Sequence, residues 1–600
     1  MTNALVPDPA SASASDPASD PTCGGVNAVS PPLVVADPGA YGWDACCDVA
    51  VIGFGAAGAC AALEAARGGL GVIVAERFEG GGASARSGGV VYAGGGTPYQ
   101  QAAGYRDTPE AMAAYLRQEV GDAVGNATLQ AFCVHSAGMI AWLEQLGARF
   151  ASTVPPRKTS YPAQDYYLYY SGNEAVADYA RHAEPAPRGH RCKGNGMSGH
   201  VLYGVLRRAV QAQAGVDVMR HAAARRLIVD GQGAVIGVEL RCLPPGRLQR
   251  RHARLACWAE RLHNLSPALA DALRRRVTQL EAKFAQPYAV RAGAVVLATG
   301  GFIFNPAMVA AHAPKYRRNW RLGTTGCDGS GIRLGLSVGA GARYLERVSA
   351  WRFINPPFDW ARGCVVDAQG ARIGNEEVYG ARLGHAMCEE HGGRAWLILN
   401  AGLARAALRD CVTGRLWAFQ RVPALMRMLF GATRAPGIEL LADRLGMPRA
   451  ALLATLAAYN AAARGERPDP TGKSAAMCAS LERGPYLAID ISAHSRTFPC
   501  PAITLGGLHV DETCGQVLAQ GSDGQAAPIQ GLYAVGRTAV GIASNHYVSG
   551  LSLADCIWSG RNAGRHLVAL AALADQPCRN EDIDEHIDEH IKETSHEQPS

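Results

Sequence analysis

A glycine pattern near the start of the chain has the residue types that bind the pyrophosphate of a dinucleotide. The pattern is Gly53-Phe54-Gly55-Ala56-Ala57-Gly58, and it follows an apolar run, residues 48–52, typical of a buried parallel strand. The first glycine allows a tight turn, the second lets the backbone approach a phosphate, and the third permits close helix–strand packing. A helix expected over residues 56–68 would offer free N–H groups and a positive dipole to the phosphates.

An acidic residue completes this unit. Glu76 ends the next apolar run, residues 71–75, and lies 23 positions after Gly53. A carboxylate in that place can accept hydrogen bonds from ribose hydroxyls. Strand, glycine turn, helix, strand and acid together predict a dinucleotide-binding Rossmann domain. The alternative, a glycine turn in an unrelated α/β fold, leaves Glu76 unexplained.

The residues after Glu76 favour FAD over NAD as the dinucleotide. The segment from Arg77 to Gly96 is rich in small and hydroxyl side chains, whereas domains that bind only NAD usually continue into another helix. Such a segment lets a second extended part of the ligand pass close to the backbone. We therefore predict FAD, and we expect these residues beside it: Arg77, Ala83, Ser84, Ser87, Gly88 and Gly89.

Two later glycine segments resemble those of FAD domains of the glutathione-reductase type. They are Ala298-Thr299-Gly300-Gly301 and Gly531-Leu532-Tyr533-Ala534-Val535-Gly536-Arg537. The resemblance spans residues 46–340 and 503–575, and it implies a discontinuous α/β Rossmann domain with an α+β catalytic domain inserted into it. It adds Gly300, Gly536 and Arg537 to the expected cofactor residues.

Other segments are similar to the fumarate reductase and 3-ketosteroid dehydrogenase superfamily of flavoproteins. They are Asp328-Gly329-Ser330-Gly331, Gly370-Ala371-Arg372, Asn375-Glu376-Glu377 and Thr504-Leu505-Gly506-Gly507-Leu508. The resemblance implies hydride exchange between flavin N5 and a carbon next to an activating carbonyl, with Asp328 and Gly329 at the cofactor. Its reductases usually carry a His before Thr-x-Gly-Gly. Here Ile503 stands there, which disfavours a dicarboxylate reductase, although Arg382 keeps that alternative open.

The stretch Ser544-Asn545-His546-Tyr547-Val548-Ser549-Gly550-Leu551-Ser552 resembles the 3-ketosteroid Δ4-(5α)-dehydrogenase type. Δ1-dehydrogenases read like Tyr-Pro-Gly-Pro-Gly in the same place. The resemblance implies that Tyr547 and Ser549 carry a proton, assisted by a second Tyr that Tyr379 matches best. Ser552 and Leu553 resemble residues whose backbone faces the flavin pyrimidine. The alternative is that Tyr547 only packs against the flavin and that Ser549 caps the following helix.

Hydroxyl groups suit removal of hydrogen from C4 and C5 of a 3-ketosteroid. The proton at C4 is acidified by the C3 ketone, whose oxygen takes up the developing charge. A free Tyr, with a pKa near ~10, is a weak base at neutral pH, so a Tyr–Ser–Tyr chain would help by passing the proton on. A carboxylate would be costly to desolvate in a steroid pocket. Δ1-dehydrogenation, reduction of a conjugated carboxylic acid, and a flavin-binding electron carrier or scaffold remain as alternatives.

Composition bounds the class of protein. The 600 residues carry a net charge of +6 without a concentrated basic face, so nothing supports nucleic-acid binding. The 17 cysteines contain no CxxC pair, which predicts reduced thiols and no metal site. The sequence shows no signal peptide and no apolar run of ~18 residues, so we expect a cytoplasmic protein with a lipophilic, steroid-like substrate. The electron acceptor stays open.

The sequence suggests five consecutive segments along the chain. We expect a disordered tail over 1–44, the first FAD part over 45–340, the catalytic domain over 341–502, the second FAD part over 503–575 and a disordered tail over 576–600. A basic helical insertion, 243–285, would be either a membrane-surface contact or a solvated hairpin. The tyrosines between 161 and 170 would line the access for a steroid or be exposed loop aromatics.

Overall fold

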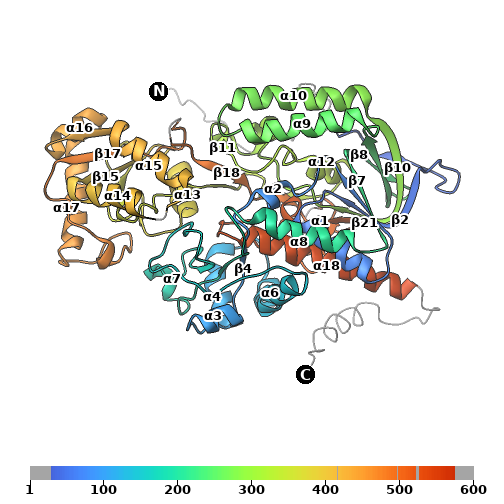
Figure 1. Ribbon diagram of the computed structural model, residues 1–600, viewed down its shortest axis with the longest axis horizontal. Helices are drawn as coiled ribbons and strands as arrows, with labels where there is room; N and C mark the ends of the chain where they lie inside the picture. Colours follow the sequence, from blue (N-terminus) through green and yellow to red (C-terminus); the bar gives the residue numbers. More distant parts are fainter. Residues whose placement is uncertain (1–28, 415, 496–497, 522–525, 575–600) are drawn as a thin grey trace, which may run out of the picture.

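The computed structural model describes residues 29–414, 416–495, 498–521 and 526–574 of the chain. In these ranges nine strands join in one large sheet (Figure 1). The strands are β1 (Leu33–Val34), β2 (Ala45–Ile52), β3 (Val72–Glu76), β7 (Val216–Arg220), β8 (Ala222–Val229), β9 (Val235–Cys242), β10 (Gln286–Leu297), β20 (Gln516–Leu518) and β21 (Pro528–Ala534).

Five of these strands form a parallel core in the order β21-β10-β2-β3-β7. The apolar residues of β2, β3 and β10 are buried on both faces where these strands pair, as parallel sheets require, whereas β7 at the edge is partly exposed. Ala534, Leu297, Ile52 and Ala75 lie side by side in register, so four strands end at one row. The loops that follow these strands therefore open at the same edge of the sheet.

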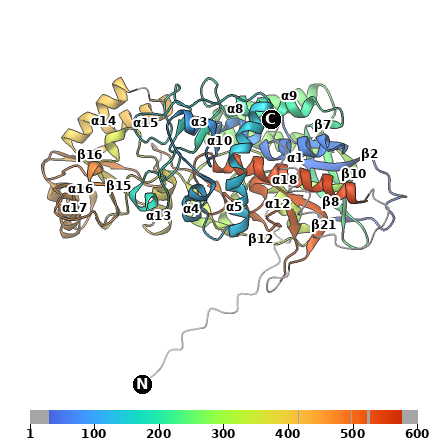
Figure 2. The same cartoon turned by 90° about the horizontal axis from the view of Figure 1, so that it is seen from below.

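Helices from the two ends of the chain pack together beside the sheet. These are α1 (Ala56–Arg67), α8 (Gly199–Gln211) and α18 (Leu551–Ala574), which lie next to one another in both views (Figures 1 and 2). A Cβ on Gly560 would lie 2.4 Å from the Ala57 carbonyl oxygen. Bare backbone therefore lets α18 approach α1 closely. The basic insertion forms α9 (Arg247–Leu262) and α10 (Pro267–Phe284), a hairpin between β9 and β10, and α12 (Ser330–Ser337) contacts β8.

A smaller cap follows the first strands. It contains the sheet β4-β6-β5 and several short helices. Their bounds are β4 (Val90–Tyr92), β5 (Leu168–Tyr169), β6 (Gly189–Arg191), α2 (Gly82–Arg86), α3 (Pro98–Ala102), α4 (Pro109–Val120), α5 (Asn126–Val134), α6 (Ser136–Gln145) and α7 (Ala177–Ala180).

The inserted domain forms the lobe at the left of Figure 1. Its sheet is β14-β15-β17-β16, that is β14 (Cys364–Val366), β15 (Trp396–Asn400), β17 (Tyr486–Asp490) and β16 (Ala432–Ala435). Its helices are α13 (Gly380–Glu389), α14 (Ala401–Thr413), α15 (Ala418–Phe430), α16 (Ile438–Leu445) and α17 (Arg449–Ala463).

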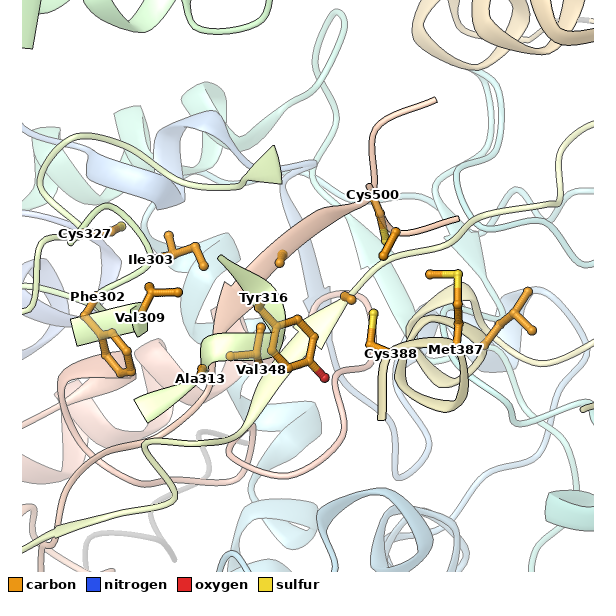
Figure 3. Close-up of a cluster of buried hydrophobic side chains, with 14 of the residues drawn as sticks. Phe302, Ile303, Val309, Ala313, Tyr316, Cys327, Val348, Met387, Cys388 and Cys500 are labelled. Carbon is orange, nitrogen blue, oxygen red and sulfur yellow. The ribbon is translucent and has the colours of Figure 1, made fainter. Parts of the chain in front are cut away.

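Short strands and a shared core join this lobe to the cofactor half. The strands β11 (Trp320–Arg321), β18 (Pro501–Thr504) and β13 (Val348–Ala350) form a three-stranded sheet, and β12 (Ala342–Arg343) pairs with β19 (Gly507–Leu508). Helix α11 (Pro306–His312) lies beside this junction. Figure 3 shows Phe302 and Val309 from the cofactor half and Met387 from α13 in one buried cluster. The two parts are therefore packed, not merely tethered.

The predicted α/β architecture, with a discontinuous Rossmann domain and an inserted domain, is confirmed. The disordered tail expected over residues 1–44 differs from the structure, which describes the chain from residue 29 onward. There β1 pairs with β8, and the Val35 N–H donates to the Val229 carbonyl at 2.8 Å. Edge pairing of backbone groups orders this segment although few of its side chains are buried. Residues 1–28 and 575–600 lie outside the described ranges, and the domain boundaries stay predictions. Within those ranges no helix is long and apolar enough to cross a membrane.

A helical glycine offers a test of the turn that opens the cofactor half. A Cβ on Gly58 would lie 2.0 Å from the Gly53 carbonyl oxygen, whereas one on Gly138, in α6, would meet nothing within 4 Å. We expect Gly58→Ala to lower the free energy of unfolding by about 1–3 kcal/mol through overpacking. Gly138→Ala, the matched control, should be neutral or slightly stabilising, measured by urea denaturation. Equal stabilities for the two variants would contradict this packing role.

Candidate active site

The glycine turn between β2 and α1 forms one wall of a large cavity. Gly53 has a φ of +106°, and a Cβ there would lie 2.6 Å from the Ala298 carbonyl oxygen. Gly53, Gly55, Ala56 and Ala57 line the cavity, while Gly58 packs behind them. The N-cap residue of α1 is Gly55, which has no side chain to cap the first turn. The N-terminal end of the helix therefore presents its N–H groups and its positive dipole to the cavity. This is the arrangement that the glycine spacing predicts.

Glu76 lies at the cavity wall with its carboxylate held by backbone. It accepts hydrogen bonds from the N–H groups of Phe54 (2.9 Å) and Phe78 (2.8 Å). Burial raises the pKa of Glu76 above its ordinary value, and these two bonds oppose the rise. A carboxylate with fixed orientation at this place fits recognition of ribose hydroxyls.

The small-residue segment follows Glu76 along the same cavity. Ala83, Ser84, Ser87 and Gly88 line it, and the Ser84 hydroxyl accepts a hydrogen bond from the Ala56 N–H at 3.1 Å. Gly89 does not line the cavity. Its φ is +66° and a Cβ there would lie 2.5 Å from the Ser198 backbone, so this glycine is needed for packing.

The later motifs converge on the same cavity. Its wall includes Gly300, Asp328, Arg537, Ser552 and Leu553. Two predicted cofactor residues lie behind the wall instead. A Cβ on Gly329 would lie 2.5 Å from the Met308 sulfur, and one on Gly536 would lie 2.9 Å from the Ala57 Cβ, so both glycines serve close packing.

The cavity has a volume of about 680 Å³ and two chemically different ends. One end is lined by Glu76, Arg77, Asp328 and several small residues of β8, and the other by Tyr161, Trp351, Tyr547 and Ser549. An elongated ligand with a ribose and a pyrophosphate near Gly53 fits the first part. An aromatic ring system fits the space between the glycine turn and the tyrosines. The residues present therefore fit FAD.

The basic insertion covers the carboxylate end of this cavity. Ala253, Ala256, Cys257 and Glu260, all on α9, line it. The insertion is therefore neither a plain solvated hairpin nor only an outer surface. The helical periodicity of residues 243–285 predicts two helices, but no pattern in the sequence indicates that they pack over the cavity.

Arg77 fastens the hairpin to the cofactor half. Its guanidinium donates to Glu281 of α10 at 2.8 Å and to Asp328 at 2.9 Å. Burial alone would lower the pKa of Arg77, but these two carboxylates raise it above its ordinary value. Arg77 and the neighbouring cations, Arg225 among them, in turn hold the pKa of Glu281 down at about 2 against the effect of burial.

Two histidines extend this network. The Nδ1 atoms of His221 and His252 are 3.0 Å apart, and their Nε2 atoms lie 3.0 Å from Glu79 and 2.9 Å from Glu281 respectively. One proton can occupy the space between the two Nδ1 atoms, and each Nε2 needs a proton to face a carboxylate. Burial and His252 lower the pKa of His221.

Hydroxyl groups gather at the opposite end of the cavity. The Ser549 hydroxyl lies 3.4 Å from the Tyr169 hydroxyl. The Tyr547 ring packs on Trp351 at 4.7 Å between ring centroids. Burial raises the pKa of Tyr547 to about 12, and the positive charge of Arg537 opposes that rise. Tyr547 and Ser549 therefore line the same cavity.

Tyr379 is close to this group but is not on the wall of the main cavity. It lines a separate space of about 10 Å³ and packs on Phe353 at 5.3 Å between centroids. Burial raises the pKa of Tyr379 well above its ordinary value; Tyr161 and Tyr547 add to the rise, whereas Ser549 lowers it. Tyr379 therefore stands one layer behind the reacting space.

One loop of the cap positions both parts of the hydroxyl cluster. The Ser549 N–H donates to the Ser171 carbonyl at 3.1 Å, and the Tyr379 N–H donates to the Asn173 side-chain oxygen at 2.6 Å. Asn173 also donates to Glu119 at 2.6 Å. This loop directly follows Tyr169, so three chain segments meet at one point.

Sequence reasoning left the roles of Tyr161 and Tyr169 open between two alternatives. Tyr169 is fully buried beside Ser549, and Tyr161 lines the cavity, while other members of the tyrosine-rich stretch are partly exposed. Tyr169 lies in the short buried strand β5, and the apolar Leu168 next to it was the available signal in the sequence. Arg382 does not line the cavity; it donates to the Tyr179 hydroxyl at 2.9 Å. That removes the arginine that favoured a carboxylate-reducing site.

Comparison with known proteins identifies relatives of the whole chain. The profile of a family described as an FAD binding domain matches residues 48–553. The chain is 42% identical over 523 residues to a 3-oxo-5-alpha-steroid 4-dehydrogenase of Comamonas testosteroni, covering 85% of this chain and 96% of that protein. It is 27% identical over 566 residues to a 3-oxosteroid 1-dehydrogenase of Mycobacterium tuberculosis, covering 83% and 94%.

Among solved structures, the fold is similar to a 3-ketosteroid-Δ4-(5α)-dehydrogenase from Rhodococcus jostii in complex with 4-androstene-3,17-dione. The TM-score is 0.73 at 28% identity, covering 90% of this chain and all of that one. The expected cofactor is confirmed: this is an FAD-binding chain.

The hairpin fastening predicts a change in cofactor affinity. Removing the charge of Glu281 leaves Arg77 and Arg225 with less compensation in a buried place, so α10 should hold less firmly. We expect Glu281→Gln to raise the Kd for FAD by about tenfold or more, measured by titrating apoprotein with FAD and following flavin fluorescence.

Glu482→Gln serves as the control, because Glu482 forms an exposed ion pair with Arg464 in the other lobe. Such pairs contribute little, so its Kd should match that of the unchanged protein. An unchanged Kd for Glu281→Gln would contradict a role of the hairpin in holding the cofactor.

Proposed function

The chain belongs to the FAD binding domain family, and from that membership we propose that it is a 3-ketosteroid dehydrogenase that forms a double bond between C4 and C5. The observation that supports this most is that Tyr547 and Ser549 line the apolar end of the FAD cavity, with the buried Tyr169 hydroxyl 3.4 Å from that of Ser549. The likeness to a 4-dehydrogenase over 85% of the chain points to the same reaction.

The apolar end suits a rigid, lipophilic substrate with few polar groups. Trp351, Leu322 and Ile503 line it, and Phe353 packs on Trp351 and Tyr161. Aromatic and aliphatic walls of this kind gain binding energy from contact area, with a small number of polar groups fixing orientation. A steroid with one reacting ketone meets this requirement.

The proposed chemistry separates one proton and one hydride. Bound FAD supplies the acceptor for the hydride that leaves C5. The proton leaves C4, which is acidic because the electron pair spreads onto the C3 carbonyl oxygen. As both C–H bonds break, the C4–C5 double bond forms, so atoms and electrons balance.

Tyr547 and Ser549 are proposed to take the C4 proton. Tyr547 is half-buried at the cavity wall, Ser549 also lines the cavity, and its hydroxyl lies 3.4 Å from the Tyr169 hydroxyl, so Ser549 can pass a proton on toward Tyr169. Arg537 makes the ionised form of Tyr547 less costly. Tyr379 is proposed as a positioning residue or later member of the row, because it lies behind the wall. The predicted cofactor residues that line the cavity are proposed to contact FAD, whereas Gly58, Gly89, Gly329 and Gly536 are proposed to pack behind its wall.

The position of the new double bond tests the proposal directly. Purified enzyme would be incubated with 5α-androstane-3,17-dione and an artificial electron acceptor, and the product identified by NMR. We expect a C4–C5 double bond. A C1–C2 double bond would show the Δ1 alternative, and reduction of acrylate-type acids without steroid turnover would show the reductase.

Removing the phenol tests the proton acceptor. We expect Tyr547→Phe to lower kcat for steroid oxidation by about 10²-fold or more, since positioned acid–base groups contribute 10²–10⁴. FAD content should be unchanged, because a Phe ring can still pack on Trp351. Tyr533→Phe is the control: its hydroxyl contacts His566 at 3.0 Å, outside the cavity. Full steroid oxidation by Tyr547→Phe would contradict a role of Tyr547 in proton transfer.

The pKa of Tyr547 predicts a pH dependence. Since burial raises that pKa to about 12, the phenol is almost fully protonated at neutral pH, and its ionised fraction grows as pH rises. We expect kcat to increase between pH 7 and 9, by at most about tenfold per unit. A kcat that falls over this range at constant FAD content would rule out Tyr547 as the proton acceptor.

A further inference from the structure

Helix α15 of the inserted lobe exposes an apolar face. Five large hydrophobic side chains are open to solvent on this one helix, and Phe430 is the most exposed at 77%. They are Phe419, Val422, Met426, Leu429 and Phe430. The end of α14 adds Val412, which is 73% exposed. Single exposed apolar residues need no explanation, but a contiguous group of this size marks a contact surface.

The spacing places these side chains on one face of the helix. They occur at intervals of three, four, three and one residue, which corresponds to a stripe about 100° wide on an α-helix. The opposite face is the one that packs on the lobe, through the buried residues Ala424, Arg427 and Met428. Helix α15 therefore has two faces with apolar side chains. The lobe covers one of them, and the other is open to solvent.

The two helices that carry the exposed apolar side chains also expose three arginines. Arg421 on α15 and Arg405 and Arg409 on the adjoining α14 are exposed. The acid in these two helices is Asp410, and its carboxylate accepts a hydrogen bond from the Phe358 N–H at 3.1 Å. The three exposed arginines therefore give these two helices a positive surface charge near the exposed apolar side chains.

The N-terminal end of α15 is continuous with the substrate end of the cavity. The Trp417 indole N–H donates to the Pro162 carbonyl at 2.9 Å, and Gln420 donates to the Tyr161 carbonyl at 3.2 Å. The rings of Phe419 and Tyr161 lie 6.1 Å apart, and Tyr161 lines the cavity. Apolar side chains therefore run from the helix surface to the cavity wall.

We propose that the exposed face of α15 docks on an anionic lipid bilayer and that the lipophilic substrate enters the cavity from that surface past Phe419 and Tyr161. The route for the substrate rests on the proposed steroid function; the docking itself does not. Apolar side chains insert at the boundary between headgroups and acyl chains, and the arginines contact lipid phosphates.

Charge favours a bilayer over a second copy of this chain as the occupant. A twofold contact would bring Arg405, Arg409 and Arg421 of two copies toward one another, whereas anionic headgroups neutralise them. The basic hairpin fits less well, although it exposes Trp258, Leu265 and Leu269. It exposes three large apolar side chains, against six on α14 and α15.

Vesicle flotation of the FAD-loaded enzyme tests the docking. The vesicles contain phosphatidylcholine with phosphatidylglycerol, and a second set contains phosphatidylcholine alone. We expect binding to the anionic set that weakens with salt. The triple variant Val422→Ser, Met426→Gln, Phe430→Ser should bind about tenfold or more weakly, since membrane affinity scales with buried apolar area.

The control variant is Leu265→Ser, Leu269→Gln on the hairpin, which should float like the unchanged enzyme. FAD absorbance and oxidation of a water-solubilised steroid should be the same in all three proteins, so a failure of the proposed function would be visible separately from a failure to dock. Absence of flotation, equal flotation of the triple variant, or a dimer that the triple variant dissociates in light scattering would each overturn the proposal.

Discussion

The site depends on one row of paired residues at the carboxyl edge of the parallel sheet. Ala75, Ile52, Leu297 and Ala534 lie in register, and the Gly53, Ala298 and Val535 N–H groups continue the ladder with bonds of 2.8–3.0 Å. Strands hundreds of residues apart therefore end together. The glycine turn at Gly53, Glu76 and the segments that hold Gly300 and Arg537 all leave from this row, and a slip of one residue would turn each strand over and separate these motifs.

A second constraint holds the reacting end. The 171–173 loop accepts hydrogen bonds from the backbone of Ser549 and of Tyr379, which belong to different parts of the chain. The cap, the closing segment before α18 and the inserted domain are thereby fixed relative to one another. A hydroxyl row can pass a proton only when its members keep such distances, so a rigid loop is a physical requirement of the proposed chemistry.

Local patterns predicted the parts of the fold that local physics determines. Gly53, Gly58 and Glu76 were interpretable because a bare turn and a terminal carboxylate have few other uses. The order of residues 29–44 was missed because edge pairing depends on a distant strand, β8. The lining role of the 243–285 insertion was likewise hidden, since its inward face is small residues that any helix tolerates. Tyr379 matched a motif, but no sequence pattern could show that it lies behind the cavity wall.

The most direct measurement of the central claim is anaerobic mixing of the FAD-loaded enzyme with 5α-androstane-3,17-dione, while flavin absorbance is followed. The flavin should bleach, and deuterium at C5 of the steroid should slow the bleaching, because the C5–H bond breaks as the hydride leaves. Bleaching slowed by deuterium at C1 and unaffected at C5, or no bleaching at all, would contradict the account.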